Sequence, residues 1–130
     1  MDTFRPGSIS PLAVIAADVE LGVGVTVGPF AVIHSGVQVG DRTFVGPHCV
    51  LGEPVASFYE SASPPPPAPC RIGADSIIRS HCVIYQGVTT GTRLQLGHRV
   101  TIREDSMIGS DVRIGTMSDL QGALTIDDHV

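Results

Sequence analysis

The 130-residue sequence has no tryptophan, and its aromatic residues together make up only 5%. It also has no run of Lys or Arg, and its formal net charge is −5. Nucleic-acid-binding domains carry basic patches and aromatic side chains on which bases stack. The sequence therefore excludes nucleic acid as an expected partner.

Long apolar runs and paired cysteine motifs are missing too. No apolar run approaches the ~18 residues that a membrane span needs, and "MDTFRPGSIS" lacks the basic and apolar segments of a signal peptide. The three cysteines, Cys49, Cys70 and Cys82, are odd in number and form no CxxC. This usage is typical of a reducing compartment rather than of a disulfide framework. We expect a cytoplasmic protein with free thiols and no membrane partner.

What the sequence does contain is an aliphatic residue at every sixth position, which we call position i. The series runs through Ile9, Ile15, Leu21, Val27, Ile33, Val39, Val45 and Leu51, and resumes at Ile72, Ile78, Ile84, Leu96, Ile102, Ile108, Ile114, Leu120 and Ile126. Only Thr90 breaks the second series. Position i+1 is very often glycine, and position i+4 is small or β-branched.

A period of six fits neither an amphipathic helix nor a long plain strand. It fits short extended segments that point i and i+4 inward and are joined by tight corners, where Gly, Asn, Asp and His tolerate left-handed backbone. Three segments make a triangular coil, and coils stack at roughly 4.8 Å. The sequence predicts one all-β domain over residues 1–130, a single-stranded parallel β-helix of roughly six coils.

The pattern [LIV]-G-x-x-[small]-x resembles the hexapeptide-repeat proteins, which are mostly acyltransferases. The resemblance extends from Ile9 to Val130. It implies a left-handed coil, which the period does not show and which the usual right-handed crossover rule would not predict.

Residues 52–71, "GEPVASFYESASPPPPAPCR", interrupt the repeat and predict a Pro-rich excursion from the coil. Four consecutive prolines favour polyproline II and forbid a ladder strand. The segment is either a tolerated surface insertion or a functional arm that reaches a neighbouring subunit or covers a ligand site. Phe58 and Tyr59 would anchor such an arm.

The repeat gives each histidine a position. His48, His81 and His129 fall at the i+3 corner position, where a polar residue tolerating a strained turn explains them. His34 falls at i+1 and is expected to be a solvated surface residue. His98 alone falls at i+2, on the outer corner directly after Gly97.

"LQLGHRVTIRED" (94–105) resembles a segment of nucleotide-sugar acyltransferases, and "IGADSIIRSHCVIYQGVTTGTRLQLGHRVTIREDSMIG" (72–109) resembles sugar O- and N-acetyltransferases. The first resemblance implies that His98 is the general base. The substrates implied are acetyl-CoA or another acyl-CoA and a sugar or nucleotide-sugar acceptor. We assign substrate binding to Ser80, His81, Tyr85 and Arg103, and expect Gly97 to leave room for a substrate beside the ring. A plain surface histidine is the alternative.

A catalytic imidazole is usually oriented by a carboxylate or carbonyl, but the residues stacked above and below His98 are Ser80 and Thr116. The orienting group must then be a hydroxyl, a backbone carbonyl or a residue of another subunit. Zinc enzymes of this fold, the γ-class carbonic anhydrases, use two histidines five residues apart. No pair here has that spacing, so we expect no metal.

The resemblance also implies a homotrimer with sites between the prisms. The chain stops at "TIDDHV", within a repeat and without a capping helix. An open last coil exposes unpaired edge groups, so we expect either a truncated chain or an end covered by neighbours. Two functions stay open, an acyltransferase that uses His98 and a non-catalytic β-helix scaffold. Truncation adds a third possibility, an acyltransferase that lacks its CoA site.

Overall fold

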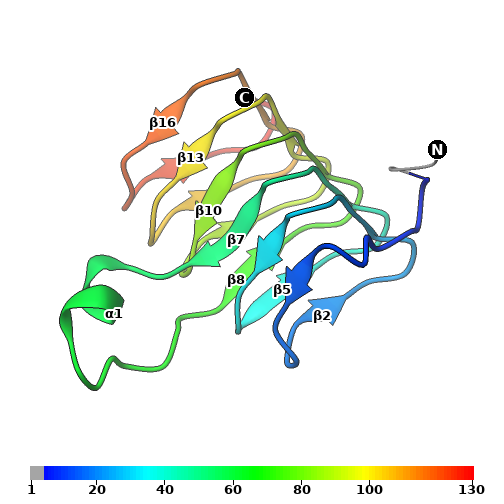
Figure 1. Ribbon diagram of the computed structural model, residues 1–130. Coiled ribbons are helices and arrows are strands. Elements are labelled where there is room, and N and C mark those ends of the chain that lie inside the picture. Colours follow the sequence, from blue (N-terminus) through cyan, green and yellow to red (C-terminus); the bar gives the residue numbers. More distant parts are fainter. Residues whose placement is uncertain (1–4) are drawn as a thin grey trace.

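The structure, a computed structural model, describes residues 5–130. The chain winds into a prism in which short strands of successive turns lie side by side (Figure 1). All strand pairs are parallel, and two sheets have six strands while the third has five. The predicted single-stranded parallel β-helix is confirmed.

The three sheets form the faces of the prism. Sheet A holds β3 (Thr26–Val27), β6 (Phe44–Val45), β9 (Ile77–Ile78), β12 (Gln95–Leu96) and β15 (Arg113–Ile114). Sheet B holds β1 (Val14–Ile15), β4 (Val32–Ile33), β7 (Val50–Glu53), β10 (Val83–Tyr85), β13 (Thr101–Ile102) and β16 (Asp119–Leu120). Sheet C holds β2 (Glu20–Leu21), β5 (Val37–Val39), β8 (Cys70–Ile72), β11 (Thr89–Thr90), β14 (Met107–Ile108) and β17 (Thr125–Ile126).

The aliphatic position of each repeat forms the core. Ile84 pairs with Ile102 across β10 and β13, and both side chains are fully buried. Burying such a side chain contributes ~1.5–3 kcal/mol. Val88 and Ser106, four positions further on, are buried as well. Thr90, the exception in the series, is buried with its hydroxyl accepting a hydrogen bond from the Gly73 N–H at 3.2 Å.

The corners confirm that position i+3 needs left-handed backbone. Non-glycine residues with positive φ at this position are Phe30, Arg42, His48, Asp75, His81, Arg93, Arg99, Asp105, Asp111, Met117, Ala123 and His129. Large and charged residues therefore occupy a conformation that usually favours Gly, Asn and Asp. The stacked coils hold them there, because the N–H of nearly every one of these residues bonds to a carbonyl of the preceding coil, as from Met117 to His98 at 2.8 Å.

Corner side chains one coil apart stack into ladders. At the corner after sheet C the ladder is ionic. The Arg42 guanidinium donates to Asp75 at 2.8 and 3.1 Å, and Arg93 donates to Asp111. The guanidinium groups hold the pKa of both Asp75 and Asp111 below its usual value. Opposite charges on successive coils thus help to fix their alignment.

The excursion leaves the prism between β7 and β8. β7 continues to Glu53 and β8 begins at Cys70, so residues 54–69 lie outside the strands. They include the short helix α1 (Ala56–Glu60), and the segment projects beyond the sheets (Figure 1).

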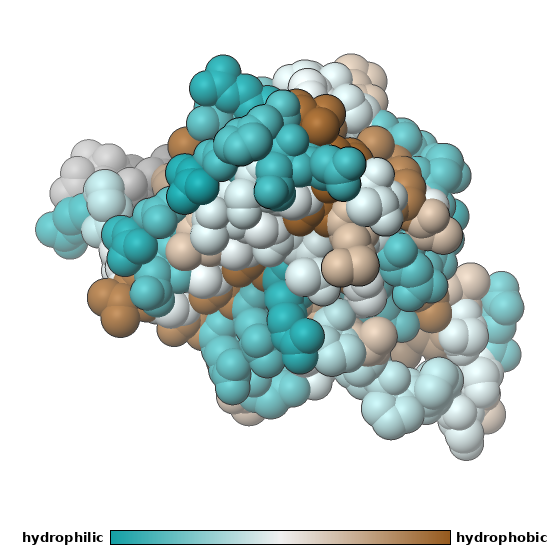
Figure 2. Space-filling model, turned by 180° about the vertical axis from the view of Figure 1, so that it is seen from behind, coloured by the Kyte–Doolittle hydropathy of each residue, from teal (hydrophilic) through white to brown (hydrophobic). Residues whose placement is uncertain are grey.

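On the face of the molecule opposite to that seen in Figure 1, hydrophobic and hydrophilic residues are interspersed (Figure 2). Within residues 5–130 no helix has the length and apolarity to cross a membrane.

Candidate functional site

His98 lies at the corner that joins β12 of sheet A to β13 of sheet B. The corners of successive coils stack with a spacing of 18 residues, so Ser80 and Thr116 lie on either side of His98. The sequence predicted these two neighbours, and the structure shows what each does.

Ser80 contacts the imidazole ring and Thr116 contacts the backbone. The Ser80 Oγ lies 2.9 Å from His98 Nδ1. The His98 N–H donates to Thr116 Oγ1 at 3.2 Å, and the His98 carbonyl accepts from the Met117 N–H at 2.8 Å. Ring and backbone are therefore both fixed, and a hydroxyl takes the place that a carboxylate often has beside a catalytic histidine.

The Ser80 contact is compatible with a tautomer in which Nε2 of His98 is the base. A neutral imidazole has one N–H and one lone pair. If Nδ1 carries the proton and donates to Ser80 Oγ, Nε2 keeps the lone pair. The side chain is exposed, so Nε2 can then accept a proton from a bound molecule.

A shallow groove of about 310 Å³ runs beside His98. Its lining includes two guanidinium groups, of Arg79 and Arg113, together with Gln95 and Thr116. Arg79 is anchored, since its Nη1 donates to the Leu96 carbonyl at 3.1 Å. The groove can therefore attract an anionic group. The sequence did not single out Arg79, Gln95 or Arg113. Their repeat positions, i+1 for Arg79 and i−1 for Gln95 and Arg113, could have indicated that they face outward near the His98 corner.

Gly97 lines the groove beside His98, and its lack of a side chain also serves the coil stack. A Cβ at this position would lie 2.5 Å from the Thr116 nitrogen and 2.6 Å from Thr116 Oγ1. The next coil therefore occupies the direction in which a side chain at this position would point. The glycine is required because two coils approach closely here.

The other predicted substrate residues divide between two corners. His81 shares the His98 corner, where its ring stacks on His48 at 4.8 Å and an interplanar angle of 11°. Tyr85 and Arg103 follow sheet B instead, at the next corner, where the Arg103 guanidinium lies 5.1 Å from the Tyr85 ring centre. The fold brings Ser80 to His98 and separates Tyr85 and Arg103 from it by the width of sheet B.

His34 differs from its expected solvated state. It is half-buried beneath the excursion, and its Nε2 lies 3.9 Å from Glu53 Oε1. The expectation failed because the repeat says nothing about where residues 54–69 fold back. Among residues 5–130 no group of three or more His, Cys, Asp or Glu side chains is arranged to hold a metal ion.

The three cysteines are buried free thiols. Burial raises the pKa of Cys70 to about 12. Cys49 and Cys82 interact with each other, which raises the pKa of Cys49 and lowers that of Cys82. Cys82 also donates to the Gly97 carbonyl at 3.1 Å, so its thiol supports the corner that carries His98.

Comparisons with known proteins bear on the repeat. Residues 18–53 match the family model described as bacterial transferase hexapeptide (six repeats). No curated protein matches the chain at a significant level.

Solved structures similar to this chain include three sugar-modifying enzymes. A variant of perosamine N-acetyltransferase from Caulobacter crescentus, in complex with CoA and GDP-perosamine, is 23% identical with a TM-score of 0.44, covering 87% of this chain and 50% of that one. UDP-N-acetylglucosamine acyltransferase from Francisella novicida is 15% identical with a TM-score of 0.48, covering 93% and 46%. The enzyme of that name from Bacteroides fragilis is 18% identical with a TM-score of 0.47, covering 93% and 68%. The chain spans about half the length of the first two, and similarities of this degree do not assign it an activity.

Proposed function

Because the chain carries the hexapeptide repeat of the bacterial transferases, we propose that it is an acyltransferase in which His98 is the general base. It moves an acyl group, most simply acetyl, from acyl-CoA to a hydroxyl or amine of a sugar or nucleotide sugar. The observation that carries the proposal is the contact of 2.9 Å between His98 Nδ1 and Ser80 Oγ, beside a groove with two guanidinium groups.

In this reaction Nε2 of His98 accepts the proton of the acceptor hydroxyl or amine as its oxygen or nitrogen bonds to the thioester carbonyl carbon. The bond from that carbon to sulfur then breaks, and the imidazolium returns the proton to the leaving thiolate. Ser80 Oγ accepts from Nδ1–H throughout and stabilises the imidazolium. General base catalysis of this kind contributes 10²–10⁴-fold.

Arg79 and Arg113 supply the charge that the substrates require. Both CoA and nucleotide sugars carry phosphate groups, and guanidinium groups bind phosphate oxygens with paired hydrogen bonds. We assign this role to the two arginines of the groove, with Ser80 and His81 bordering the acceptor.

The proposed homotrimer is supported by the outer face of sheet B. The outward residues of its first five strands are Val14, Val32, Val50, Val83 and Thr101, and the sixth strand, β16, presents Asp119. The β-branched side chains of these five strands lie between the His98 corner and the corner that carries Tyr85 and Arg103. A second copy packed on it would place those two corners at the edges of one interface. Tyr85 and Arg103 would then contact substrate across that interface, and the buried free thiols support a cytoplasmic location.

A thioester assay tests the proposal against a scaffold role. The chain is incubated with acetyl-CoA and a panel of nucleotide sugars, and released thiol is measured. We expect His98→Ala to lower kcat/KM by at least ~10²-fold, with unchanged circular dichroism. His48→Ala and His129→Ala are matched controls, because they remove corner histidines outside the groove, and should leave turnover nearly unchanged. His81→Ala should have an intermediate effect.

Two outcomes would support the scaffold instead. One is the absence of thiol release with any acceptor, and the other is an equal response of all four histidine variants. Sedimentation at micromolar concentration tests the trimer separately, and a clean monomer would contradict it.

A further inference from the structure

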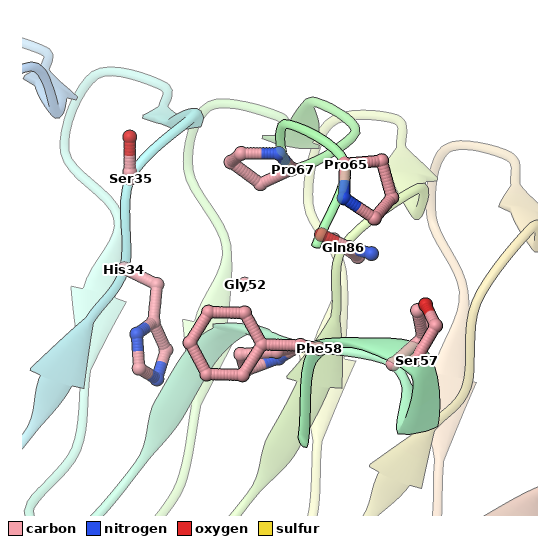
Figure 3. Close-up of a pocket in the computed structure, with 10 residues that line it drawn as sticks. His34, Ser35, Gly52, Ser57, Phe58, Pro65, Pro67 and Gln86 are labelled. Atoms are coloured by element: carbon pink, nitrogen blue, oxygen red, sulfur yellow. The ribbon is translucent and has the colours of Figure 1, made fainter. Parts of the chain in front are cut away.

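The excursion folds back onto the prism and is held at both ends. The Cys70 N–H donates to the Gly36 carbonyl at 3.1 Å, and the Gly87 N–H donates to the Pro69 carbonyl at 2.9 Å. At the other end the Tyr59 hydroxyl donates to Glu53 at 3.0 Å. These bonds form a pocket of about 170 Å³ between residues 54–67 and the corner after sheet B (Figure 3).

The walls of the pocket are mostly apolar. They are formed by Pro54, Val55, Phe58, Pro65 and Pro67. Figure 3 shows Pro65 and Pro67 across the pocket from the Phe58 ring. Proline has no N–H and a fixed φ, so these walls are rigid and offer no donor. A flat group can lie between the aromatic ring and the prolines.

Polar groups lie at the edge of the pocket rather than in its walls. They belong to His34, Ser35, Ser57 and Gln86. Within residues 5–130, the side-chain amide of Gln86 and the hydroxyl of Ser57 make no hydrogen bond. The backbone of Gln86 is fixed, since its N–H donates to the Glu53 carbonyl at 3.1 Å. A side-chain amide both donates and accepts, so Gln86 can pair with a group that does the same.

The charges around the pocket disfavour an anion. Glu53 lies behind His34, and Asp18 accepts from the Ser35 hydroxyl at 2.7 Å. This bond lowers the pKa of Asp18, which is therefore ionised at neutral pH. No Lys or Arg lines the pocket. A carboxylate or phosphate entering it would meet two negative charges and no guanidinium.

We propose that this pocket binds a single flat, uncharged ring with an amide-type edge, of the size of a pyrimidine. An engineered apolar cavity of about 150 Å³ holds one benzene ring, so a pocket of about 170 Å³ holds one ring and not two. Phe58 stacks on the ring, and Gln86 hydrogen-bonds to its edge. The site shares no residue with the His98 groove and does not depend on acyl transfer.

Saturation-transfer NMR with uracil as the probe tests the proposal. A ligand of this size binds with a Kd of roughly 0.1–10 mM. Three compounds are compared with uracil. Benzene lacks the amide edge, orotate adds a negative charge, and adenine adds a second ring. We expect each of the three to bind at least ~10-fold more weakly than uracil. Equal binding of benzene or orotate would overturn the proposed chemistry, and absence of uracil binding would overturn the site.

Two variants locate the bound ring. Phe58→Ala removes the ring on which uracil stacks and should lower the affinity for uracil at least ~10-fold. Gln86→Leu keeps the bulk of the side chain and removes its amide, so it should lower the affinity for uracil and leave the affinity for benzene unchanged. Phe30→Ala is the matched control, because Phe30 is 54% exposed at another corner and Phe58 is 50% exposed. Equal loss in the Phe30 and Phe58 variants, or no loss in the Phe58 and Gln86 variants, would place the ring elsewhere.

Discussion

Ile102 offers a direct test of the coil register. Its side chain is fully buried in sheet B and pairs with Ile84, which is also fully buried. Replacing it with aspartate puts a carboxyl group among aliphatic side chains. We expect Ile102→Asp to unfold the stack at neutral pH.

The magnitude follows from two losses. The lost apolar burial costs ~1.5–3 kcal/mol. A carboxyl group without a partner in an apolar core has its pKa raised by up to 3–5 units, to about 7–9. At pH 7 the penalty is therefore set by the gap between pH 7 and the unfolded pKa of ~3.9, which at 1.36 kcal/mol per unit is about 4 kcal/mol. The sum is about 6–7 kcal/mol, which is comparable to the ~5–15 kcal/mol that stabilise a whole domain.

The dependence on pH separates the two losses. The folded pKa of the introduced carboxyl is raised, so the ionisation penalty is absent below the unfolded pKa of ~3.9 and grows as pH rises above it. Ile102→Asn has the same shape and no charge, and should show the burial loss at every pH. Thermal melts followed by circular dichroism from pH 3.5 to 8 measure both variants.

Met107→Asp is the control, because Met107 lies on β14 and is 61% exposed. It should change Tm little. If Ile102→Asp melted like the native chain at pH 7 while Met107→Asp unfolded, the inward and outward faces would be exchanged and the register would be refuted.

Three further predictions follow from single contacts. Ser80→Ala should lower kcat for acyl transfer ~10–100-fold with little change in KM, because the orienting hydroxyl of His98 is lost; unchanged kcat in the thiol-release assay would contradict this role. Asp111→Asn should make the decrease of Tm between pH 5 and 3 smaller than in the native chain. The bond with Arg93 lowers the folded pKa of Asp111, so this stability is present above the unfolded pKa and is lost as pH falls through the folded pKa; an equal Tm decrease in variant and native chains between pH 5 and 3 would contradict it. The Cys70 thiol, with a pKa of about 12, should resist alkylation at pH 8 in the native state and react in urea, as mass spectrometry of the labelled peptide will show.

The sequence predicted the coil because every turn follows the same rule, an aliphatic residue at each sixth position. Ile84, Ile102, Val88 and Ser106 fall inside because residues 18 apart pair in the sheets, and a period of six fixes this pairing. The sequence showed that position i+1 is very often glycine without showing why. In the structure Gly97 has an ordinary φ, and it is small because Thr116 lies against it. Close approach between coils is a tertiary property that the local pattern does not show.

The candidate site was predictable only where it follows the repeat. Ser80 stacks on His98 because both hold the same position in successive coils. The groove arginines belong to different strands and corners, and no local motif connects them. The pocket beneath the excursion depends on how residues 54–69 fold back, and a segment without a period leaves that open. Its walls come from segments far apart in the sequence, from His34 to Pro67, and this is why the sequence did not predict the pocket.

The stacking of parallel coils also determines how the molecule responds to force. Successive coils are joined by hydrogen bonds and side-chain ladders that run along the axis, with a spacing of 18 residues. Tension applied through the two ends therefore loads one coil boundary at a time, and each peeled coil releases roughly 60 Å of extended chain. The coil that contains the excursion spans 33 residues between paired positions, so it releases roughly 110 Å. A force trace would show a ladder of equal steps with one long step between Leu51 and Ile84.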